Sequence, residues 1–528
     1  MNKFLRSLIG ILTITVPGMA VEATGATPRL VVGIHIDQLR TDYLDWFKDG
    51  FSEDGLKKML QNGIVYRSIN YDYPNPDAAS ATASIVTGAS PSRHGIIASR
   101  WFDRASHNVI SCVFDPSYLG NYTSSTASPK YLIATTLGDE LKDATNNQSK
   151  VFSIGISAES AIVSGGHKAD GVFWMDDNSG QWCTSTFYNY MPWWMQRIND
   201  QENQSGTMDQ TAWQPLYPLN FYRYMPYQTN PTLFEYWLGK YGKDKFKAFK
   251  ETPMANAEVC KIGLETIEKE HLGTDDIPDY LILNLNASGY LENSKKMSAV
   301  ETQDIYFRLD QEIGKVIDAV DRQVGLENAL IYIVGTGAPK NPATDAASTA
   351  TYGGDFYPDR CTSLLNLYLM AIYGDEKWVS GYYNQQIYLN RTLIDKKKID
   401  FDEISTKASE FLGEFSGVQR VIRNRQFVTG SYDSSLNSYR KGLFPAHSGD
   451  FRLDLQPGWN IRNDNQEKDL QVRYEAYTTS MIVYGANLKA QTITRPVSSS
   501  DIATTLSKVF KIRPPNASEG SLLKELTN

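Results

Sequence analysis

Two residues near the N-terminus have side chains of the kind that bind metal ions. His35 and Asp37 lie two positions apart at the end of an apolar, β-branched run, so in a strand they would share one face. An imidazole and a carboxylate there could bind a metal weakly, but a zinc site needs more protein ligands than these two. We therefore expect a buried histidine at position 35. We expect Asp37 to have a structural role, either capping the strand end or pairing with Arg40.

A second group of polar residues surrounds the start of an Ala/Ser/Thr-rich stretch. Ser80 and Thr82 carry hydroxyls, but a hydroxyl without an adjacent base or metal is a poor nucleophile, so we expect both to be packing or helix-surface residues. Asp77 immediately precedes Ala78 and suits a helix N-cap. Its carboxylate could also mimic a bound phosphate at the helix N-terminus and so close such a site to phosphate. Both interpretations of Asp77 remain open from the sequence.

The elements that must position these residues alternate between strand and helix. This alternation predicts an α/β fold with a mostly parallel central sheet and helices on both faces. Chemistry in such sheets sits at the carboxyl ends of the strands, where Asp37, the loop before Ala78, and the turns at Gly289 and Gly335 fall. The expected strands are 30–36, 65–69, 151–156, 280–285, 330–334 and 482–484, and the expected helices include 56–60, 78–87, 132–144, 302–324, 404–415 and 502–510.

An aromatic-rich stretch at about 182–241 has no clear hydrophobic period. It predicts an inserted cap, which we place at approximately 175–275. Its aromatic side chains could form a contact surface, since such residues are enriched at interfaces, or they could be the core of the cap. The residues concerned are Trp182, Tyr188, Tyr190, Trp193, Trp194, Trp213 and Tyr217.

Composition limits the classes of function that fit this chain. The 528 residues are 41% hydrophobic and 21% charged, which is typical of a globular protein with a large core. The formal net charge is -8, and the densest basic cluster is the short run 396–398. Nucleic acid binding is therefore disfavoured.

The N-terminus has the pattern of a secretory signal peptide, which we assign to residues 1–26. Lys3 and Arg6 precede a short apolar stretch at 8–16, and small residues follow it. That stretch is too short to span a bilayer, and no other apolar run is long enough, so we expect no transmembrane span in the mature chain. The remaining residues, 27–525, are expected to form one large domain that carries the cap.

The four cysteines are Cys112, Cys183, Cys260 and Cys361. In an oxidising compartment an even number permits two disulfides, in any of three pairings. Buried free thiols are the other interpretation. Their wide spacing does not suggest a metal site.

Several stretches of the chain resemble the alkaline phosphatase superfamily, above all the phosphate-irrepressible alkaline phosphatases of Bacteroidota and the nucleotide pyrophosphatase/phosphodiesterases. The resemblance covers about 29–525. It implies an alkaline-phosphatase-like fold in which three Asp and three His hold two zinc ions and a Thr or Ser attacks phosphorus. The similar segments are LVVGIHIDQLRTDYL from Leu30, ASIVTGASPSRHGI from Ala83, LIATTLGDEL from Leu132, AIVSGGH from Ala161, QDIYFRLDQEIGKVIDAVD from Gln303, SGDFRLDLQPGW from Ser448 and RPVSSSDIATTL from Arg495.

Carried over residue by residue, the metal and nucleophile positions of the family are almost all replaced. Asp37 matches the first metal ligand, but the nucleophile position falls on Ala78. The interval 457–482, where the last histidine ligand is expected, contains no histidine. The other vestigial metal-site positions are Gly289, Asn293, Gly335 and Thr336.

The substrate-binding positions are replaced as well. The resemblance implies an Asn, a Lys and an Arg, which fall on Ser99, Ser157 and Glu159. A cation that held phosphate has thus become an anion.

The sequence therefore predicts an exported, catalytically inactive alkaline-phosphatase-like protein, without a zinc site or other cofactor. We expect it in the periplasm or at the cell surface, with a binding or scaffolding role toward an envelope protein. Two alternatives remain: an active metal-dependent phosphatase or phosphodiesterase with an atypical site, and a glycan-binding protein.

Overall fold

A single large sheet organises most of the chain, and a computed structural model describes it for residues 27–201, 204–223, 233–288, 299–337, 353–430, 433–462, 470–472, 478–485 and 487–527. The eleven strands run in the order β21-β2-β20-β12-β1-β11-β6-β7-β8-β5, with β22 paired to β2. Their bounds are β1 Leu30–Asp37, β2 Ile64–Asn70, β5 Gly120–Asn121, β6 Val151–Gly155, β7 Gly171–Met175, β8 Trp182–Ser185, β11 Asp279–Asn286, β12 Ala329–Thr336, β20 Thr479–Gly485, β21 Gln491–Ile493 and β22 Val497–Ser498.

The centre of this sheet is parallel. β1 pairs in parallel with both β11 and β12, and β6 continues the parallel set from β11 to β7. The strand expected at 482–484 belongs to β20, which runs antiparallel between β12 and β2. The predicted fold class, a mostly parallel α/β sheet, is confirmed.

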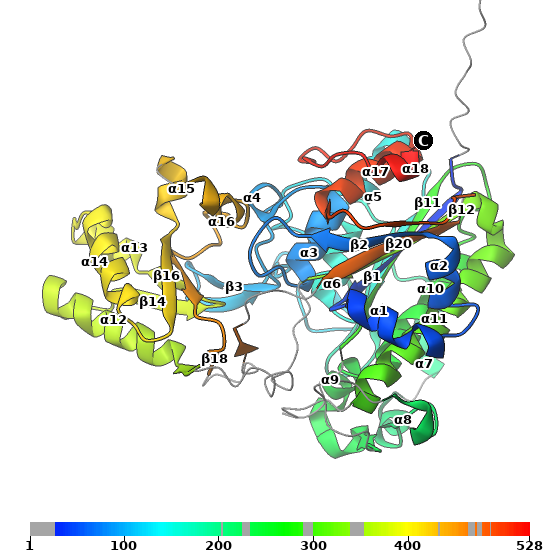
Figure 1. The fold of residues 1–528 in the computed structure, drawn as a ribbon, viewed down its shortest axis with the longest axis horizontal. Helices are drawn as coiled ribbons and strands as arrows, with labels where there is room; N and C mark the ends of the chain where they lie inside the picture. The colour runs from blue at the N-terminus through cyan, green and yellow to red at the C-terminus, as the bar shows by residue number, and fades with distance from the viewer. Residues whose placement is uncertain are drawn as a thin grey trace, which may run out of the picture.

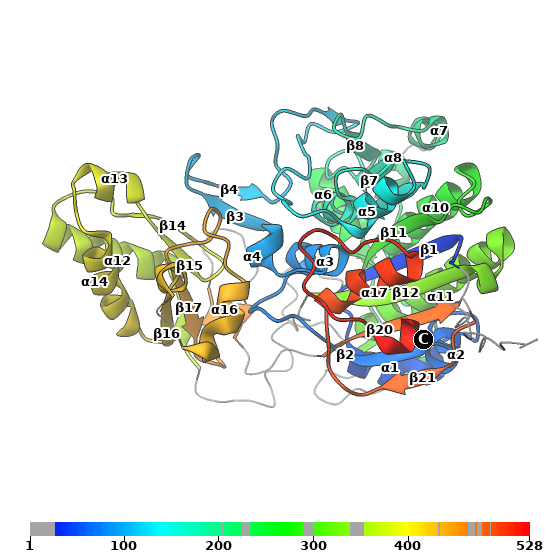
Figure 2. The same cartoon turned by 90° about the horizontal axis from the view of Figure 1, so that it is seen from above.

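Helices cover both faces of the sheet because side chains of the central strands alternate between two cores. Leu30, Val32 and Ile34 of β1 face one apolar core, and Val31 faces the other. Figure 2 shows the helices on either side of the strands. The first core is covered by α1 Thr41–Phe47, α2 Leu56–Asn62, α10 Met254–Lys269 and α11 Ala299–Val324, and the second by α3 Ala78–Thr87, α5 Leu137–Ala144, α6 Ala158–Gly165 and α17 Ser500–Phe510.

The helix expected at 132–144 begins only at Leu137. Thr136 caps it, because its hydroxyl accepts the Asp139 amide at 3.1 Å while the Asp139 carboxylate accepts the Thr136 amide at 2.9 Å. This reciprocal capping box fixes the first turn and leaves 132–136 outside the helix.

Residues 353–462 form a small lobe beside the main body, which the sequence did not predict as a unit (Figure 1). A four-stranded sheet packs against three helices around a core of its own. The Arg104 guanidinium of the main body joins the lobe, lying 3.2 Å from the Asp450 carboxylate. The elements are β14 Val379–Tyr383, β15 Gln386–Leu389, β16 Val418–Arg423, β17 Phe451–Leu455, α12 Pro358–Tyr373, α13 Arg391–Lys396 and α14 Phe401–Gly413.

The segment expected to be a cap contains α7 Trp193–Gln201, α8 Gln204–Asp209 and α9 Lys245–Lys250. Three of its aromatics, Trp182, Trp194 and Trp213, are buried in the core that also contains α11. Trp213 donates its indole N–H to Asp304 at 2.7 Å. Trp193 is 66% exposed, so it remains available as a contact residue.

All four cysteines are buried free thiols, so the interpretation with two disulfides is wrong. Among the described residues, no helix is both long and apolar enough to cross a membrane. The predicted signal peptide at 1–26 lies outside the described residues.

Candidate functional site

The candidate site lies where the central parallel strands end. Asp37, the last residue of β1, is in register with Asn286 of β11 on one side and Thr336 of β12 on the other. The topology thus brings the Asp37 and Thr336 positions together, as the resemblance implies. Gly289 and Asn293 follow β11 and lie outside the described residues.

Gly335, the position implied for a metal-binding aspartate, has no room for a side chain. An ideal Cβ on this residue would lie 1.7 Å from the Thr479 hydroxyl oxygen and 3.1 Å from Cβ of Leu39. Thr479 is buried on the neighbouring strand β20, and its hydroxyl has no hydrogen-bond partner among the described residues. The Gly335 carbonyl accepts a hydrogen bond from the Tyr71 hydroxyl at 2.7 Å. The space of the implied ligand is therefore already filled by packed side chains.

Gly337 sits between Asp37 and the loop that leads into α3. Its φ is +80°, and an ideal Cβ would lie 3.3 Å from Asp37 Oδ1 and 3.3 Å from the Asp77 carbonyl carbon. A side chain at 337 would be strained by the backbone angle as well as by these contacts. Asp37 and Asp77 thus both lie next to Gly337.

Asp77 caps α3, and its carboxylate is fully engaged. Oδ1 accepts the Ser80 amide at 3.0 Å, the Ser80 hydroxyl donates to the same oxygen at 2.9 Å, and Oδ2 accepts the Ser99 amide at 2.6 Å. The N-cap interpretation of Asp77 is confirmed. The helix N-terminus and the Ser99 amide, two groups suited to an external anion, are therefore occupied by a carboxylate of the protein.

Ala78 is the first residue of α3, where the nucleophile is implied. The hydroxyl nearest in sequence belongs to Ser80, which is buried and committed to the cap. Thr82 is buried as well. The burial of Ser80 and Thr82 is consistent with the prediction that both are packing residues.

Two of the three substrate positions, Ser99 and Glu159, are connected through the end of β4. The Ser99 carbonyl accepts the Cys112 amide at 2.9 Å, and neighbouring Ser111, the last residue of β4 Asn108–Ser111, donates its hydroxyl to Glu159 at 2.8 Å. Burial raises the pKa of the Cys112 thiol, and the charges of Glu159 and Asp77 raise it further, whereas Arg100 opposes them. Asp77 and Glu159 thus both lie close enough to the Cys112 thiol to raise its pKa.

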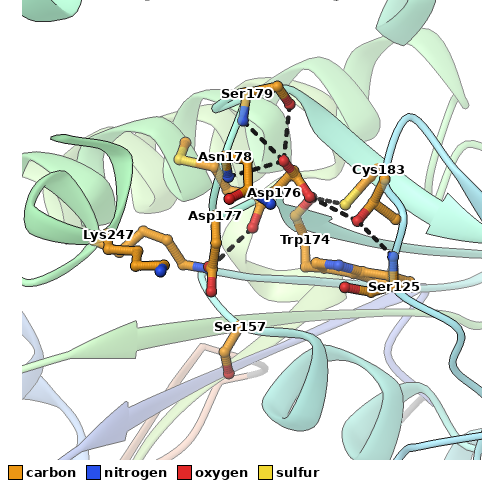
Figure 3. A network of polar contacts seen from close by, with 12 residues as sticks. Ser125, Ser157, Trp174, Asp176, Asp177, Asn178, Ser179, Cys183 and Lys247 are labelled. Atoms are coloured by element: carbon orange, nitrogen blue, oxygen red, sulfur yellow. Dashed lines mark hydrogen bonds and ion pairs between the residues drawn. The ribbon is translucent and has the colours of Figure 1, made fainter. Parts of the chain in front are cut away.

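Ser157 caps α6, its hydroxyl accepting the Ser160 amide at 3.4 Å. Figure 3 draws Ser157 together with the turn between β7 and β8, and β6, which precedes Ser157, pairs with β7 through Gly155 and Trp174. In that turn Asp176 accepts the amides of Asn178 and Ser179 at 2.9 and 2.8 Å. Burial opposes ionisation of Asp176, but these bonds and those from the Thr123 and Ser179 hydroxyls outweigh it and lower its pKa.

Lys250 is a cation close to this turn, and it is held by the protein itself. Its ammonium donates to the Met175 carbonyl at 2.9 Å and also pairs with Asp177. Its charge is therefore balanced by a carboxylate and does not replace the cation missing at 157 and 159.

Three histidines, His35, His94 and His167, are hydrogen-bonded to other groups of the fold. His35 is buried and shares a hydrogen bond of 3.0 Å with the Tyr332 hydroxyl, and burial lowers its pKa to about 3. His94 shares a bond of 3.1 Å with the Ser84 hydroxyl, and burial lowers its pKa to about 3. His167 bonds Asp139 at 2.9 Å. Each of these imidazoles has a partner within the fold.

The described residues do not fit a site of two zinc ions held by three aspartates and three histidines. Within the part of the chain that the structure describes, no group of three or more His, Cys, Asp or Glu side chains could hold a metal ion. Asp37 and Asp77 are the carboxylates beside Gly337, and both oxygens of Asp77 already accept hydrogen bonds. The segments 289–298 and 338–352, which follow β11 and β12, are not among the residues to which this statement applies.

Thr479, Ser111 and Gly337 were not predicted as members of this site. Each takes its role from a contact with a residue far away in the chain: Thr479 with Gly335, Ser111 with Glu159, and Gly337 with the loop at 76–77. No signal in the local sequence marks such contacts.

The chain as a whole is similar to a known protein family. A family model described as "Type I phosphodiesterase / nucleotide pyrophosphatase" matches residues 31–480. The alkaline phosphatase PafA of Elizabethkingia meningoseptica is 27% identical over 98% of both chains, and a protein of Myroides odoratus named calcium-transporting ATPase is 28% identical over 94% of both. The crystal structure of wild-type alkaline phosphatase PafA superposes with a TM-score of 0.83 at 25% identity, covering 95% of this chain and 99% of that one.

One prediction requires correction in the light of these relatives. The prediction that the chain uses no cofactor is contradicted, because similar proteins of almost the same length are alkaline phosphatases, a metal-dependent class of enzyme. The physical reason for the error is that ligands can come from any loop at this edge, including the segments outside the described residues. Metal content is therefore a quantity to be measured.

Proposed function

This chain belongs to the type I phosphodiesterase / nucleotide pyrophosphatase family within the alkaline phosphatase superfamily, and we propose that it is a member that binds without hydrolysing. In this proposal it is an exported pseudophosphatase of the periplasm or cell surface. Its role is binding or scaffolding of an envelope protein partner.

The observation that carries the proposal is the structure at the start of α3. The position where the resemblance implies the nucleophile is Ala78, whose methyl group cannot attack phosphorus. The adjacent Asp77 carboxylate bonds the amides of Ser80 and Ser99 at 3.0 and 2.6 Å. A phosphate entering here would have to displace a hydrogen-bonded carboxylate and would lack a hydroxyl to react with.

The charges at the substrate positions support the same proposal. Glu159 stands where a cation is implied and is held toward β4 by Ser111 at 2.8 Å. The Asp77 carboxylate bonds the Ser99 amide, so a phosphate dianion at the implied substrate positions 99 and 159 would meet the carboxylates of Asp77 and Glu159. Like charges in a partly buried site cost free energy rather than supply it.

Export and partner binding rest on other parts of the chain. The pattern of residues 1–26 supports a signal peptide. The exposed ring of Trp193 supports a contact surface. Because Trp182, Trp194 and Trp213 are buried, the aromatic surface available for stacking on a glycan is smaller than the sequence indicated.

The test is an activity assay of the mature chain supplied in turn with Zn²⁺, Mg²⁺ and Ca²⁺. p-Nitrophenyl phosphate and bis(p-nitrophenyl) phosphate serve as monoester and diester substrates, with PafA as the positive control. We expect no hydrolysis above the rate without protein, while elemental analysis of the same samples records how much metal is bound. Metal-dependent hydrolysis that is lost in Asp37→Ala would overturn the proposal.

The second candidate is an active metal-dependent phosphatase or phosphodiesterase with an atypical site. The observation that favours it is that relatives named alkaline phosphatases align with more than nine-tenths of this chain. The same assay separates the two candidates, because only the enzyme would turn over either ester.

A further inference from the structure

The hairpin formed by β3 Arg100–Asp103 and β4 stands apart from the main sheet. Its strands pair in antiparallel register from Arg100 with Ser111 to Asp103 with Asn108, and they form a two-stranded sheet of their own. Figure 2 shows this hairpin between the main body and the small lobe. Because a hairpin of two strands is marginally stable by itself, its position depends on the contacts that hold its two ends.

The base of the hairpin is held by residues of the candidate site. Ser99, which precedes β3, donates its amide to the Asp77 carboxylate at 2.6 Å. Ser111, the last residue of β4, donates its hydroxyl to Glu159 at 2.8 Å. The Cys112 amide donates to the Ser99 carbonyl at 2.9 Å and so joins the two sides of the base. Each strand of the hairpin is therefore tied at its base to a carboxylate of the site.

The tip of the hairpin is held by the small lobe through a buried charge. Arg104, in the turn between the strands, lies 3.2 Å from the Asp450 carboxylate and donates to the Ser448 carbonyl at 3.0 Å. Its guanidinium also lies over the Tyr388 ring, 4.9 Å from the centroid. Asp450 is 4% exposed, and removing one partner of a buried ion pair is strongly destabilising. The lobe therefore holds the turn firmly.

Aromatic packing holds the same end of the hairpin against the lobe. Trp101 stacks on His447 with 4.2 Å between the ring centroids, and Phe102 lies 4.9 Å from Tyr388 in the same measure. Phe102 also covers Gly381 of β14, where an ideal Cβ would lie 2.7 Å from its ring. Both rings of β3 are buried, so the tip has little freedom to move while it contacts the lobe.

We propose that the β3–β4 hairpin couples the small lobe to the candidate site, so that the lobe regulates how firmly Asp77 and Glu159 hold the residues at the substrate positions. Because the hairpin depends on contacts at both ends, releasing its tip lowers the free energy needed to release its base. The effect is reciprocal, since two sites linked by one equilibrium affect each other by the same factor. The coupling rests on the proposed function for the identity of the site, but it does not require that an ester is bound or hydrolysed there.

Hydrogen exchange of the full mature chain, resolved to single amides by fragmentation in the mass spectrometer, measures this coupling. In Arg104→Ala we expect the Ser99 amide to exchange faster by about tenfold or more, while amides in the centre of β1 keep the wild-type rate. The variant should fold, because Asp450 keeps an ion pair of 2.6 Å with Arg391. Faster exchange at Ser99 alone separates coupling from a general loss of stability.

Arg391→Ala is the matched control. Arg391, the first residue of α13, binds the same Asp450 carboxylate as Arg104 but belongs to the lobe. Its removal weakens the hold on Asp450 and leaves the hairpin its own guanidinium, so the Ser99 amide should exchange as in the wild type. Equal acceleration at Ser99 in Arg391→Ala and Arg104→Ala would refute coupling through the hairpin.

Gly381→Ala disturbs the hairpin tip from the lobe without changing the hairpin itself. Because the added methyl group would lie 2.7 Å from the Phe102 ring, the tip must shift. The Ser99 amide should again exchange faster than in the wild type. An unchanged Ser99 amide in both Gly381→Ala and Arg104→Ala would overturn the proposal.

Ser111→Ala tests the reverse direction, because it frees the base of the hairpin from Glu159. The Leu389 amide, which donates to Asp450 at 2.7 Å, should then exchange faster. The effects of Ser111→Ala and Arg104→Ala on stability should not add in the double variant, and strict additivity would contradict the coupling. Ester hydrolysis by the wild type would overturn the proposed function alone, since the coupling is measured without a ligand.

Discussion

The hydroxyl oxygen of Thr479 lies only 1.7 Å from the place where a Cβ on Gly335 would be. The two residues come from neighbouring antiparallel strands, β20 and β12. The space in which the resemblance implies a ligand side chain at position 335 is thus part of the packed interior of the sheet.

Restoring an aspartate at this position should destabilise the protein. Gly335→Asp must displace Thr479 and bury a charge, which we expect to cost about 3 kcal/mol or more of the free energy of unfolding. Urea denaturation followed by circular dichroism measures the loss. Gly413→Asp is the control, because an added Cβ there meets nothing within 4 Å. Equal stability of the two variants would show that the space at 335 is not closed.

Shortening Thr479 should be tolerated. Its buried hydroxyl has no hydrogen-bond partner in the part of the chain that the structure describes, so Thr479→Ala removes an unsatisfied polar group and should change the free energy of unfolding by less than about 1 kcal/mol. The double variant Gly335→Asp with Thr479→Ala should recover part of the stability lost by Gly335→Asp. Strictly additive effects would contradict a direct contact between the two side chains.

Removing the Asp77 carboxylate should weaken both α3 and the loop that contains Ser99. Asp77→Ala leaves the amides of Ser80 and Ser99 without acceptors and should cost about 2 kcal/mol. Asp77→Asn retains one acceptor oxygen and should cost less. Hydrogen exchange at the Ser99 amide gives a local measure, and unchanged protection in Asp77→Ala would contradict the assigned bond.

Stability should fall as the pH is lowered below 6.5. Burial lowers the pKa of both His35 and His94 from 6.5 to about 3, so between these values the unfolded chain binds protons that the folded chain does not. Each histidine should then remove about 1 kcal/mol of stability per pH unit within that window.

The check is the slope of the free energy of unfolding against pH in the wild type and in a His35→Gln, His94→Gln double variant. The slope should be shallower in the variant. His167 changes the stability with pH in the opposite direction, because its hydrogen bond and charge interaction with Asp139 outweigh burial and raise its pKa. The stability that His167 contributes is present below pH 6.5 and is lost as the pH rises through the pKa of His167 in the folded protein. An unchanged slope in the double variant would refute the assignment.

The two adjacent tryptophans of α7 should behave differently. Trp194 is buried and donates to Glu270 at 2.8 Å, so Trp194→Ala should cost about 3–5 kcal/mol. Trp193→Ala should leave stability within about 0.5 kcal/mol and weaken capture of an envelope partner. Pull-down from the native envelope with both variants, at equal abundance, measures this. Unchanged capture by Trp193→Ala would remove this ring from the contact surface.

Local patterns in the sequence were sufficient for much of the fold. The apolar run before Asp37 predicted β1, and Asp77 followed by small residues predicted the start of α3 at Ala78. These succeed because burial periodicity and helix capping depend on residues within a few positions of one another. The hydrophobic pattern also predicted a helix that begins at 132, whereas α5 begins at Leu137, because such a pattern does not reveal where a capping box starts the helix.

What the sequence determined by itself was the family, the order of most strands and helices, and the identities at positions such as Ala78 and Glu159. Only the tertiary structure decided that Thr479 fills the space at Gly335, that Ser111 holds Glu159, and that residues 353–462 form a separate lobe. The physical reason is the distance along the chain. A contact between residues dozens of positions or more apart depends on how whole strands are brought together, and no short stretch of sequence contains that information.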